Sequence, residues 1–455
     1  MAPCRSDRRR PRICRQGSGS VSTPHRTWPF PARWASWRFP PSCIVCSGET
    51  SHARQDRNGC RCRAPPNACG SPPAQSATRV LADRRPVRST EGSVVSVLEA
   101  TAARLISDAG DGAPPGVVLG INTPGIKASV SAGHRTVRWE GDVRHGVAAM
   151  TVETYHDLAS VTKVVATTTA LIRLVSAGLV DLDSAVRRYL PNFTGDATVR
   201  DLLLHRAGLW EWYPLYISPR QVEELPRRYE PRQERHYSDL GFILLGRIIA
   251  TAFGGDLERA VTELVTTPLE LINTRFAHPA GEPVATGARD DRIEMTMLDT
   301  GRPYPVPHRS TEFTGWRQHS IDGEVADCNA YHAFGGVAGH AGLFSNVPDL
   351  LRWATALADY EEHDVLWQPD VAREFFTAGP DETQALGFRR YRLDLPGETV
   401  TVLGHPGYVG CAVGFVPGRG IALALGSNRL LVPGTPVSTE TLFTELLTTT
   451  STLLQ

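Results

Sequence analysis

The stretch "HDLASVTKVVATTTALIRLV", residues 156–175, holds one of only two lysines in a chain of 455 residues. The other is Lys127, and all remaining strong bases are arginines. Arginine stays protonated in proteins because its pKa exceeds about 12, whereas a desolvated lysine can accept a proton. Lys163 follows Ser160 by three positions, so on a helix the two side chains share one face. The stretch therefore indicates a serine nucleophile with lysine as its proton partner.

The residues after Lys163 predict a helix with Ser160 in its first turn. Apolar residues recur at helical spacing, and Gly178 ends the helix as a C-cap. Free N–H groups and the positive dipole at a helix start favour developing negative charge. Burial among these apolar residues is expected to lower the pKa of Lys163. A Ser-x-x-Lys spacing also arises by chance because serine is common, so other stretches must carry the same chemistry.

The bulk composition argues against several classes of function. Lysine plus arginine and aspartate plus glutamate number 48 each, so the formal net charge is zero and no nucleic-acid partner is expected. The chain has no run of about 18 apolar residues, so no membrane span is expected. Beyond residue 90 only Cys328 and Cys411 remain, too few for a disulfide framework. We therefore expect a reducing, cytoplasmic location.

Residues 1–90 differ in composition from residues 91–455. They are rich in arginine and proline, poor in acids, and hold seven of the nine cysteines. Such a segment cannot bury enough apolar surface to offset its ordering entropy, so we expect a disordered leader or a mis-assigned start, followed by one folded domain. Cys43 and Cys46 form a C-x-x-C pair without a second pair at zinc-site spacing. The segment "FPPSCIVCSG" is too short and too polar for a signal peptide.

Predicted strands lie at both ends of this domain, and predicted helices lie between them. After a first helix at 93–109, two strands at 116–125 and 127–137 flank a turn. The C-terminal part is predicted as four strands and a closing helix, at 391–395, 399–404, 411–417, 420–428 and 438–454. We therefore expect an α/β (α+β) fold. One antiparallel sheet, formed by the N- and C-terminal segments and flanked by helices, faces a mostly helical inserted subdomain across a cleft.

Two further stretches support chemistry at the serine. The stretch "HYSDLGFILLG" places Tyr237 and Asp239 just before an apolar helix. The stretch "GHPGYVG" places His405 and Gly407 directly after a strand. An edge strand that ends in glycines can bring a backbone N–H close to a reacting carbonyl group.

With these stretches in this order, the chain resembles the serine β-lactamase and penicillin-binding-protein superfamily, nearest its class C and esterase-like branch. The supporting flanks, which span roughly residues 95–445, are "LASVTK", "VDLDSAVRRYLP", "TVRDLLLHRAGL" and "AFGGVAGHAGLFSNVPDLLRWA". The resemblance implies a β-lactamase/transpeptidase-like fold and catalysis through an acyl-enzyme.

The resemblance also implies a role for each matching residue. Ser160 would be the acylated nucleophile, Lys163 its proton partner, and Tyr237 the base or a proton shuttle. Whether Lys163 or Tyr237 is the acylation base stays open, as it does among relatives. The backbone N–H groups of Ser160 and Tyr408 would form the oxyanion hole.

Two positions depart from the pattern of the superfamily. His405 and Gly407 match the third motif, but Pro406 stands where threonine is usual and lacks both a hydroxyl and a backbone donor. The second motif ends in Asp239 instead of asparagine. Relatives use the missing asparagine amide and threonine hydroxyl to hold an amide or a carboxylate of a β-lactam or peptide. Binding of esters, which have fewer polar groups, would therefore be weakened less. Asp239 either points into the site, where its carboxylate would raise the pKa of the group that must take the Ser160 proton and give the pH profile an alkaline rising limb, or caps the following helix.

Other candidate sites have plainer interpretations. The α/β-hydrolase alternative would require G-x-S-x-G, which the chain lacks. Cys328, His332 and His340 could form a metal cluster, but they lie in the family's glycine-rich loop, so we expect no metal and no cofactor. Three aromatic residues either line an acyl pocket or cover the core: Trp210, Trp212 and Tyr213.

The sequence thus predicts a serine hydrolase acting on small ester or amide substrates. A β-lactamase or D-alanyl-D-alanine carboxypeptidase proper, and a non-catalytic penicillin-binding sensor, are the alternatives. Retention of Ser160, Lys163 and Tyr237 together favours an enzyme over a sensor. The sequence does not predict the oligomeric state.

Overall fold

The computed structural model describes residues 90–108, 110–140, 143–218 and 220–455, so the predicted leader lies outside the described residues apart from its last position. The strands are β1 Gly116–Thr123, β2 Ile126–Glu140, β3 Val143–Ala149, β4 His156–Asp157, β5 Arg275–Phe276, β6 Leu343–Ser345, β7 Arg389–Leu395, β8 Glu398–Pro406, β9 Ala412–Val416 and β10 Ile421–Ser427. The helices are α1 Thr90–Leu105, α2 Thr169–Ser176, α3 Val199–Leu203, α4 Asp239–Phe253, α5 Leu257–Val261, α6 Arg292–Thr300, α7 Val347–Ala358, α8 Pro369–Phe376 and α9 Thr439–Leu454.

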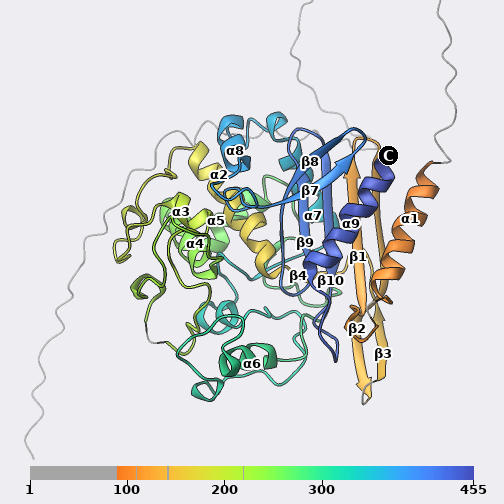
Figure 1. The fold of residues 1–455 in the computed structure, drawn as a ribbon, viewed down its shortest axis with the longest axis horizontal. Coiled ribbons are helices and arrows are strands. Elements are labelled where there is room, and N and C mark those ends of the chain that lie inside the picture. The colour runs from red at the N-terminus through yellow and green to blue at the C-terminus, as the bar shows by residue number, and fades with distance from the viewer. Residues whose placement is uncertain (1–89, 109, 141–142, 219) are drawn as a thin grey trace, which may run out of the picture. The chain divides into compact units, whose positions relative to one another are not determined.

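One antiparallel sheet joins the two ends of the described chain, as the sequence predicted. Its seven strands follow the order β3-β2-β1-β10-β9-β8-β7. The pairing of β1 with β10, with Leu119 opposite Leu425, connects the N-terminal strands to the C-terminal strands. Helices α1 and α9 pack side by side on one face, and α7 packs on β9 and β10 (Figure 1).

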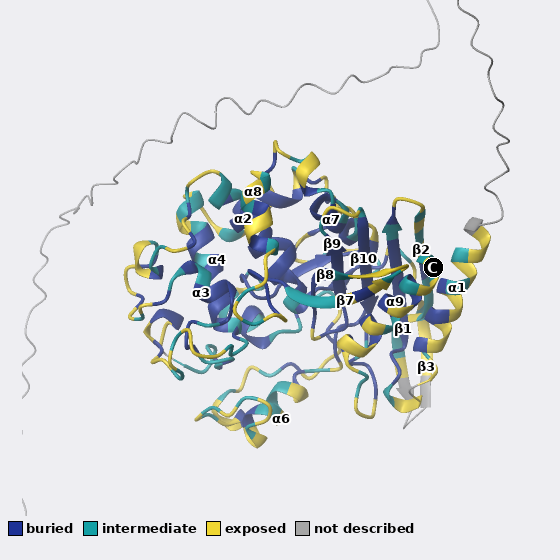
Figure 2. Ribbon diagram, turned by 45° about the horizontal axis from the view of Figure 1, so that its top comes forward, coloured by how far each residue is buried: buried dark blue, intermediate teal, exposed yellow. Residues whose placement is uncertain are grey.

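Both faces of the central strands are covered, so these strands are continuously apolar. Leu119 and Leu425 belong to the apolar core that includes residues of α1 and α9, while Val118 and Ala424 face the second core, which includes α7. Figure 2 shows β9 and β10 buried, whereas α6 carries exposed residues. The hydrophobic contribution of a fully buried Leu or Val is about 1.5–3 kcal/mol, so the two cores together hold the sheet between its helices.

In the region between the two halves of the sheet, the regular elements are mostly helices joined by long loops, which confirms the predicted insertion. Helices α2 and α4 are buried in it, and α2 contacts both α4 and α8. Sequence analysis missed a small sheet here, with strand order β4-β6-β5, and it also missed β3 of the main sheet. Strands of two or three residues are too short for an alternating pattern to be recognised.

The segment that carries Ser160 is helical, but it is not a uniform α-helix. A 3₁₀ turn at Ala159–Val161 leads into a π-helix at Lys163–Thr168, which continues as α2. The hydroxyl of Thr168 donates to the Lys163 carbonyl oxygen at 2.8 Å, and so supports the wider π turn. Gly178 adopts a left-handed φ of 69° beyond the helix end, as expected of a C-terminal glycine.

No helix of the described residues is by itself long and apolar enough to cross a membrane. Helix α4 and residues 257–266 meet the length and composition criteria only as a pair, and that pair is bent by 78°.

Candidate active site

The structure brings the three predicted catalytic side chains together at the start of the α2 segment. The Lys163 ammonium donates to Ser160 Oγ at 2.9 Å, and the Tyr237 hydroxyl donates to the same oxygen at 3.0 Å. Tyr237 is held just before α4, whose N-cap is Ser238. Ser160 Oγ is therefore in contact with two groups that can exchange protons with it.

Asp239 points into the site and does not cap its helix. Its Oδ1 lies 2.7 Å from Lys163 Nζ, whereas the Ser238 hydroxyl accepts the Gly241 N–H and provides the cap. Lys163 is fully buried and also donates to the carbonyl oxygen of His340 at 3.1 Å. The buried ammonium thus has a carboxylate, a hydroxyl and a carbonyl as acceptors.

The pKa of Lys163 is raised, as expected for an Asp239 that points into the site, and is not lowered, as burial alone was expected to do. Burial lowers the pKa of Lys163, but the Asp239 carboxylate and the Tyr237 oxygen together raise it above its usual value. Burial also raises the pKa of Tyr237, against a lowering effect of Lys163. Both residues therefore hold their protons at neutral pH in the absence of substrate.

The third predicted motif lies beside the site at the end of β8. The sequence predicted an edge strand here, but β8 lies between β7 and β9 in the sheet. It pairs with β7 as far as Gly404 and with β9 as far as Pro406, so only its last two residues extend beyond β7. A side chain at Gly407 would meet the Leu158 carbonyl oxygen at 2.4 Å. Glycine is required because this backbone packs directly against the turn before Ser160.

His405 is a neutral imidazole, whereas a cation is usual at this position of the third motif. It is buried, and its Nδ1 donates to the Pro406 carbonyl oxygen at 2.8 Å, so Nδ1 carries the proton. Burial, together with Arg389 and Lys163, holds the pKa of His405 well below its usual value. Its Nε2 is buried and lacks a hydrogen-bond partner among the described residues, although His405 as a residue lines the cavity.

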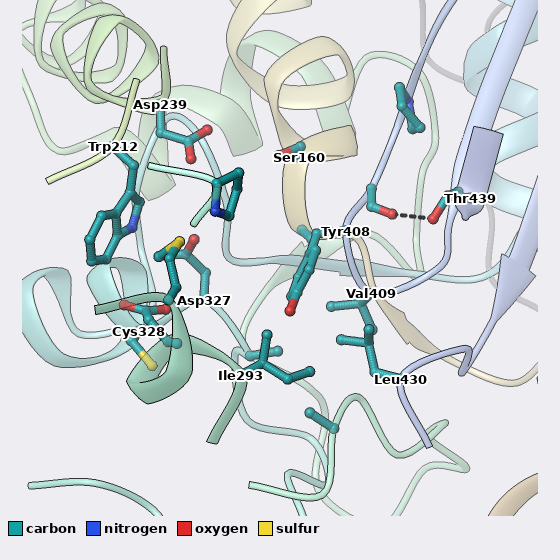
Figure 3. A pocket seen from close by; sticks show the side chains of 18 of the residues that line it. Ser160, Trp212, Asp239, Ile293, Asp327, Cys328, Tyr408, Val409, Leu430 and Thr439 are labelled. Atoms are coloured by element: carbon teal, nitrogen blue, oxygen red, sulfur yellow. Dashed lines mark hydrogen bonds between the residues drawn. The ribbon is translucent and has the colours of Figure 1, made fainter. Parts of the chain in front are cut away.

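Tyr408, the predicted oxyanion-hole residue, has a backbone N–H without an acceptor in the part of the chain that the structure describes. Its side chain is 48% exposed and stands in a cavity of about 670 Å³ that Ser160 also lines. Figure 3 shows the Tyr408 ring between Asp239 and Trp212 on one side and Val409 and Leu430 on the other. Tyr408 therefore has a backbone N–H that is not engaged by any of the described residues, and it lines the same cavity as Ser160.

The aromatic residues near position 210 divide between the two interpretations that the sequence left open. Trp212 is buried and lines the cavity. Trp210 and Tyr213 pack against the helical core, where Trp210 also lies 4.6 Å from the Arg228 guanidinium. Only Trp212 of these three is therefore placed to contact a substrate.

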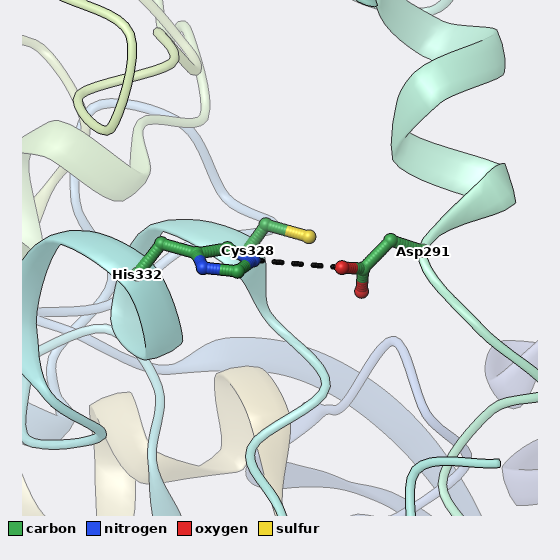
Figure 4. Close-up of side chains that lie close together, drawn as sticks. All are labelled: Asp291, Cys328 and His332. Atoms are coloured by element: carbon green, nitrogen blue, oxygen red, sulfur yellow. Dashed lines mark hydrogen bonds and ion pairs between the residues drawn. The ribbon is translucent and has the colours of Figure 1, made fainter. Parts of the chain in front are cut away.

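Of the three residues weighed in the sequence as an alternative metal cluster, Cys328 and His332 lie together, but their third neighbour is Asp291 and not His340 (Figure 4). His340 instead lies 3.0 Å from Asp327. The guanidinium of Arg317 donates to both oxygens of Asp291, at 2.8 and 3.0 Å to one and 3.2 Å to the other. A cation bound here would have to compete with Arg317 for that carboxylate.

Sequence analysis missed two histidines that support the site. The Nδ1 atom of His205 accepts the Ser238 N–H at 3.0 Å, and the His205 ring lies 4.7 Å from the Tyr237 ring. His340 provides the carbonyl acceptor for Lys163 and pairs with Asp327 through its ring. Both histidines lie in stretches that support the family resemblance. A match of sequence in these stretches does not show which residues the histidines contact.

The fold and the site together define a β-lactamase-type hydrolase. The β-lactamase family profile matches residues 102–442, and the chain belongs to this family. It is 31% identical over 321 residues to an Escherichia coli K12 protein named "Putative D-alanyl-D-alanine carboxypeptidase", and the match covers 63% of this chain and 71% of the relative. It is 29% identical over 356 residues to the N-acetylmuramyl-L-alanine amidase of Bacillus subtilis, and that match covers 70% of this chain and 78% of the amidase.

A solved structure supports the fold at lower sequence identity. EstCE1, described as a hydrolase with promiscuous acyltransferase activity, superposes with a TM-score of 0.56 at 21% identity. The match covers 79% of this chain and 98% of EstCE1.

Proposed function

We propose that this protein hydrolyses small ester or amide substrates through an acyl-enzyme at Ser160. The observation that carries the proposal is the convergence of Lys163 and Tyr237 on Ser160 Oγ, at 2.9 and 3.0 Å. A serine hydroxyl is a weak nucleophile until a neighbouring base takes its proton. Two proton-exchanging groups in direct contact with the hydroxyl meet that requirement.

The reaction proceeds in two half-reactions. Ser160 Oγ passes its proton to whichever of Lys163 and Tyr237 is deprotonated, and bonds to the substrate carbonyl carbon. The carbonyl oxygen becomes an oxyanion, stabilised by the backbone N–H groups of Ser160 and Tyr408. The bond to the leaving alcohol or amine then breaks, and the leaving group takes up the proton. Water attacks the resulting ester by the same route and regenerates Ser160.

Carboxypeptidase activity is a second candidate, favoured by Arg429. This residue lines the cavity, and its Nε and one terminal nitrogen donate to the carbonyl oxygens of Tyr408 and Val437, at 2.9 and 3.1 Å. None of the ion pairs within the described ranges includes Arg429. A held guanidinium without an ion-paired carboxylate is suited to a substrate carboxylate, such as the free end of a D-alanyl peptide.

A substrate panel separates these candidates. Purified protein is assayed with p-nitrophenyl esters, nitrocefin and a D-alanyl-D-alanine peptide. Turnover of the esters, with Ser160→Ala inactive, supports the first proposal, and release of D-alanine supports the second. Absence of turnover on all three, together with no serine-directed labelling, would favour the non-catalytic sensor.

A further inference from the structure

Asp157 is a buried carboxylate that touches the site only through the backbone. It lies in β4, is 2% exposed, and divides its two oxygens between two segments. Oδ1 accepts the Ala159 N–H at 2.8 Å, and Oδ2 accepts the Ala326 N–H at 2.7 Å. A buried carboxylate is costly unless hydrogen bonds meet its charge, so this geometry links two otherwise separate segments of the chain.

The first bond fixes the turn that presents the nucleophile. Ala159 has a φ of 43°, in the left-handed region that non-glycine residues rarely adopt. A side-chain oxygen that accepts the N–H two residues ahead forms an Asx turn, which defines the backbone at this point. Ser160 comes next in the chain, so the direction of its Oγ depends on the strained Ala159 conformation.

The second bond fixes the segment that supports Lys163. Ala326 precedes Asp327, whose carboxylate lies 3.0 Å from the His340 ring. The His340 carbonyl oxygen in turn accepts from Lys163 at 3.1 Å. One carboxylate therefore connects the nucleophile turn to the support of its proton partner.

We propose that Asp157 is a positioning residue, whose two oxygens hold Ser160 and the support of Lys163 in the relative geometry that acylation needs. The inference rests on the proposed function for its kinetic consequences and on the two hydrogen bonds for its structural ones. A displacement of about 1 Å can cost about 100-fold in rate. Loss of either bond is therefore expected to slow acylation of Ser160 by about 10–100-fold.

The arrangement also predicts a pH effect. Burial raises the pKa of Asp157 to about 6, while the two backbone N–H groups and Arg317 lower it and Asp327 raises it. The neighbouring Cys411 thiol remains protonated, since burial raises its pKa. Burial lowers the pKa of His156, the preceding residue, to about 4, so His156 stays neutral above that pH. Below about pH 6 Asp157 becomes protonated and its acid hydroxyl oxygen is a much weaker acceptor for its N–H, so the rate falls more steeply with decreasing pH than protonation of a single base explains.

The test compares Asp157→Asn with Asp349→Asn in the full chain. Asparagine keeps one acceptor oxygen but presents an NH₂ group to the other backbone N–H. Asp349 is a matched control, because it is also buried and accepts the Asn273 N–H at 2.7 Å, yet the partners of its side chain, Asn273 and Thr274, lie outside both the Ser160 turn and the segment 324–328. The first readout is the rate of fluorophosphonate labelling on both sides of the Asp157 pKa of about 6. The second readout is amide hydrogen exchange in peptides that cover residues 156–162 and 324–328.

Asp157→Asn should be labelled about 10–100-fold more slowly than the unmodified protein. Its labelling rate should lose the steeper pH dependence below about pH 6, and both peptides should exchange faster. Asp349→Asn should match the unmodified protein in labelling rate, pH dependence and exchange. Labelling at the wild-type rate, or unchanged exchange at 156–162, would overturn the inference. If the wild-type protein is never labelled, the proposed function fails, and the exchange comparison still decides whether Asp157 holds the two segments.

Discussion

The two walls of the cavity differ in how completely their side chains are held. The polar wall, formed by Ser160, Tyr237 and Asp239 and backed by the buried Lys163, is connected by hydrogen bonds and an ion pair before any substrate is bound. The open wall, formed by α6, Tyr408 and Arg429, includes the half-exposed Tyr408 ring and a guanidinium without an ion-paired acid among the described residues. We therefore propose that the polar wall sets the chemistry and the open wall selects the substrate. Substitutions should therefore change kcat on one wall and KM on the other.

The largest expected effect is that of Lys163→Arg. Guanidinium keeps the positive charge but cannot accept a proton, so we expect a loss of roughly 10²–10⁴ in kcat, close to that of Lys163→Ala. Lys127→Arg, at an exposed position of β2, is the matched control and should leave kcat unchanged. Steady-state assays with a p-nitrophenyl ester measure both. Full activity in the Lys163→Arg protein would mean that the lysine serves only as a fixed charge.

The next effect is a displaced pH profile in Asp239→Asn. The Asp239 carboxylate raises the pKa of Lys163, so removing its charge should lower that pKa and move the rising alkaline limb to lower pH. Asp290→Asn removes another cavity carboxylate, one that pairs with Arg292, and should leave the limb in place. Profiles of kcat against pH, measured for Asp239→Asn and Asp290→Asn, test both expectations. A limb that stays in place in Asp239→Asn contradicts the electrostatic role of the carboxylate.

The same division explains how much the sequence could predict. The polar wall could be predicted residue by residue, because Ser160 and Lys163 are neighbours on one helical segment and Tyr237 has a recognisable motif. The sheet was predictable from its apolar strands, apart from β3 and the strands of two or three residues. The raised pKa of Lys163 could be predicted only on the condition that Asp239 points into the site, and the structure was needed to establish that orientation. The neutral state of His405 could not be predicted, since it depends on burial and on groups far away in the chain. Arg429 has no sequence signal, because its role depends on the absence of an ion-pair partner.

On the open wall, Arg429→Gln should change substrate preference with a smaller effect on rate. A hydrogen bond to a charged group contributes about 1.5–3 kcal/mol, so KM for a D-alanyl-D-alanine peptide should rise about 10–100-fold. KM for the same peptide with an amidated end should not change. Arg292→Gln is the control, because Arg292 lines the same cavity but pairs with Asp290 at 2.6 Å. Equal KM changes for the acid and the amide would remove Arg429 from carboxylate recognition.

The smallest expected effect is that of removing residues 1–90. The sequence of this segment has no apolar periodicity with which to dock on the domain. A protein that begins at Glu91 should match the full chain in melting temperature and ester turnover. Loss of either property would show that the segment contributes to the fold or to the site.

The most direct test of the central claim is detection of the covalent adduct on Ser160. The protein is incubated with a fluorophosphonate, digested, and the modified residue is located by mass spectrometry, with Ser160→Ala treated in parallel. The account predicts one adduct on Ser160 in the unmodified protein, faster formation as the pH rises, and none in Ser160→Ala. An adduct on another residue, or equal labelling of both proteins, would contradict it.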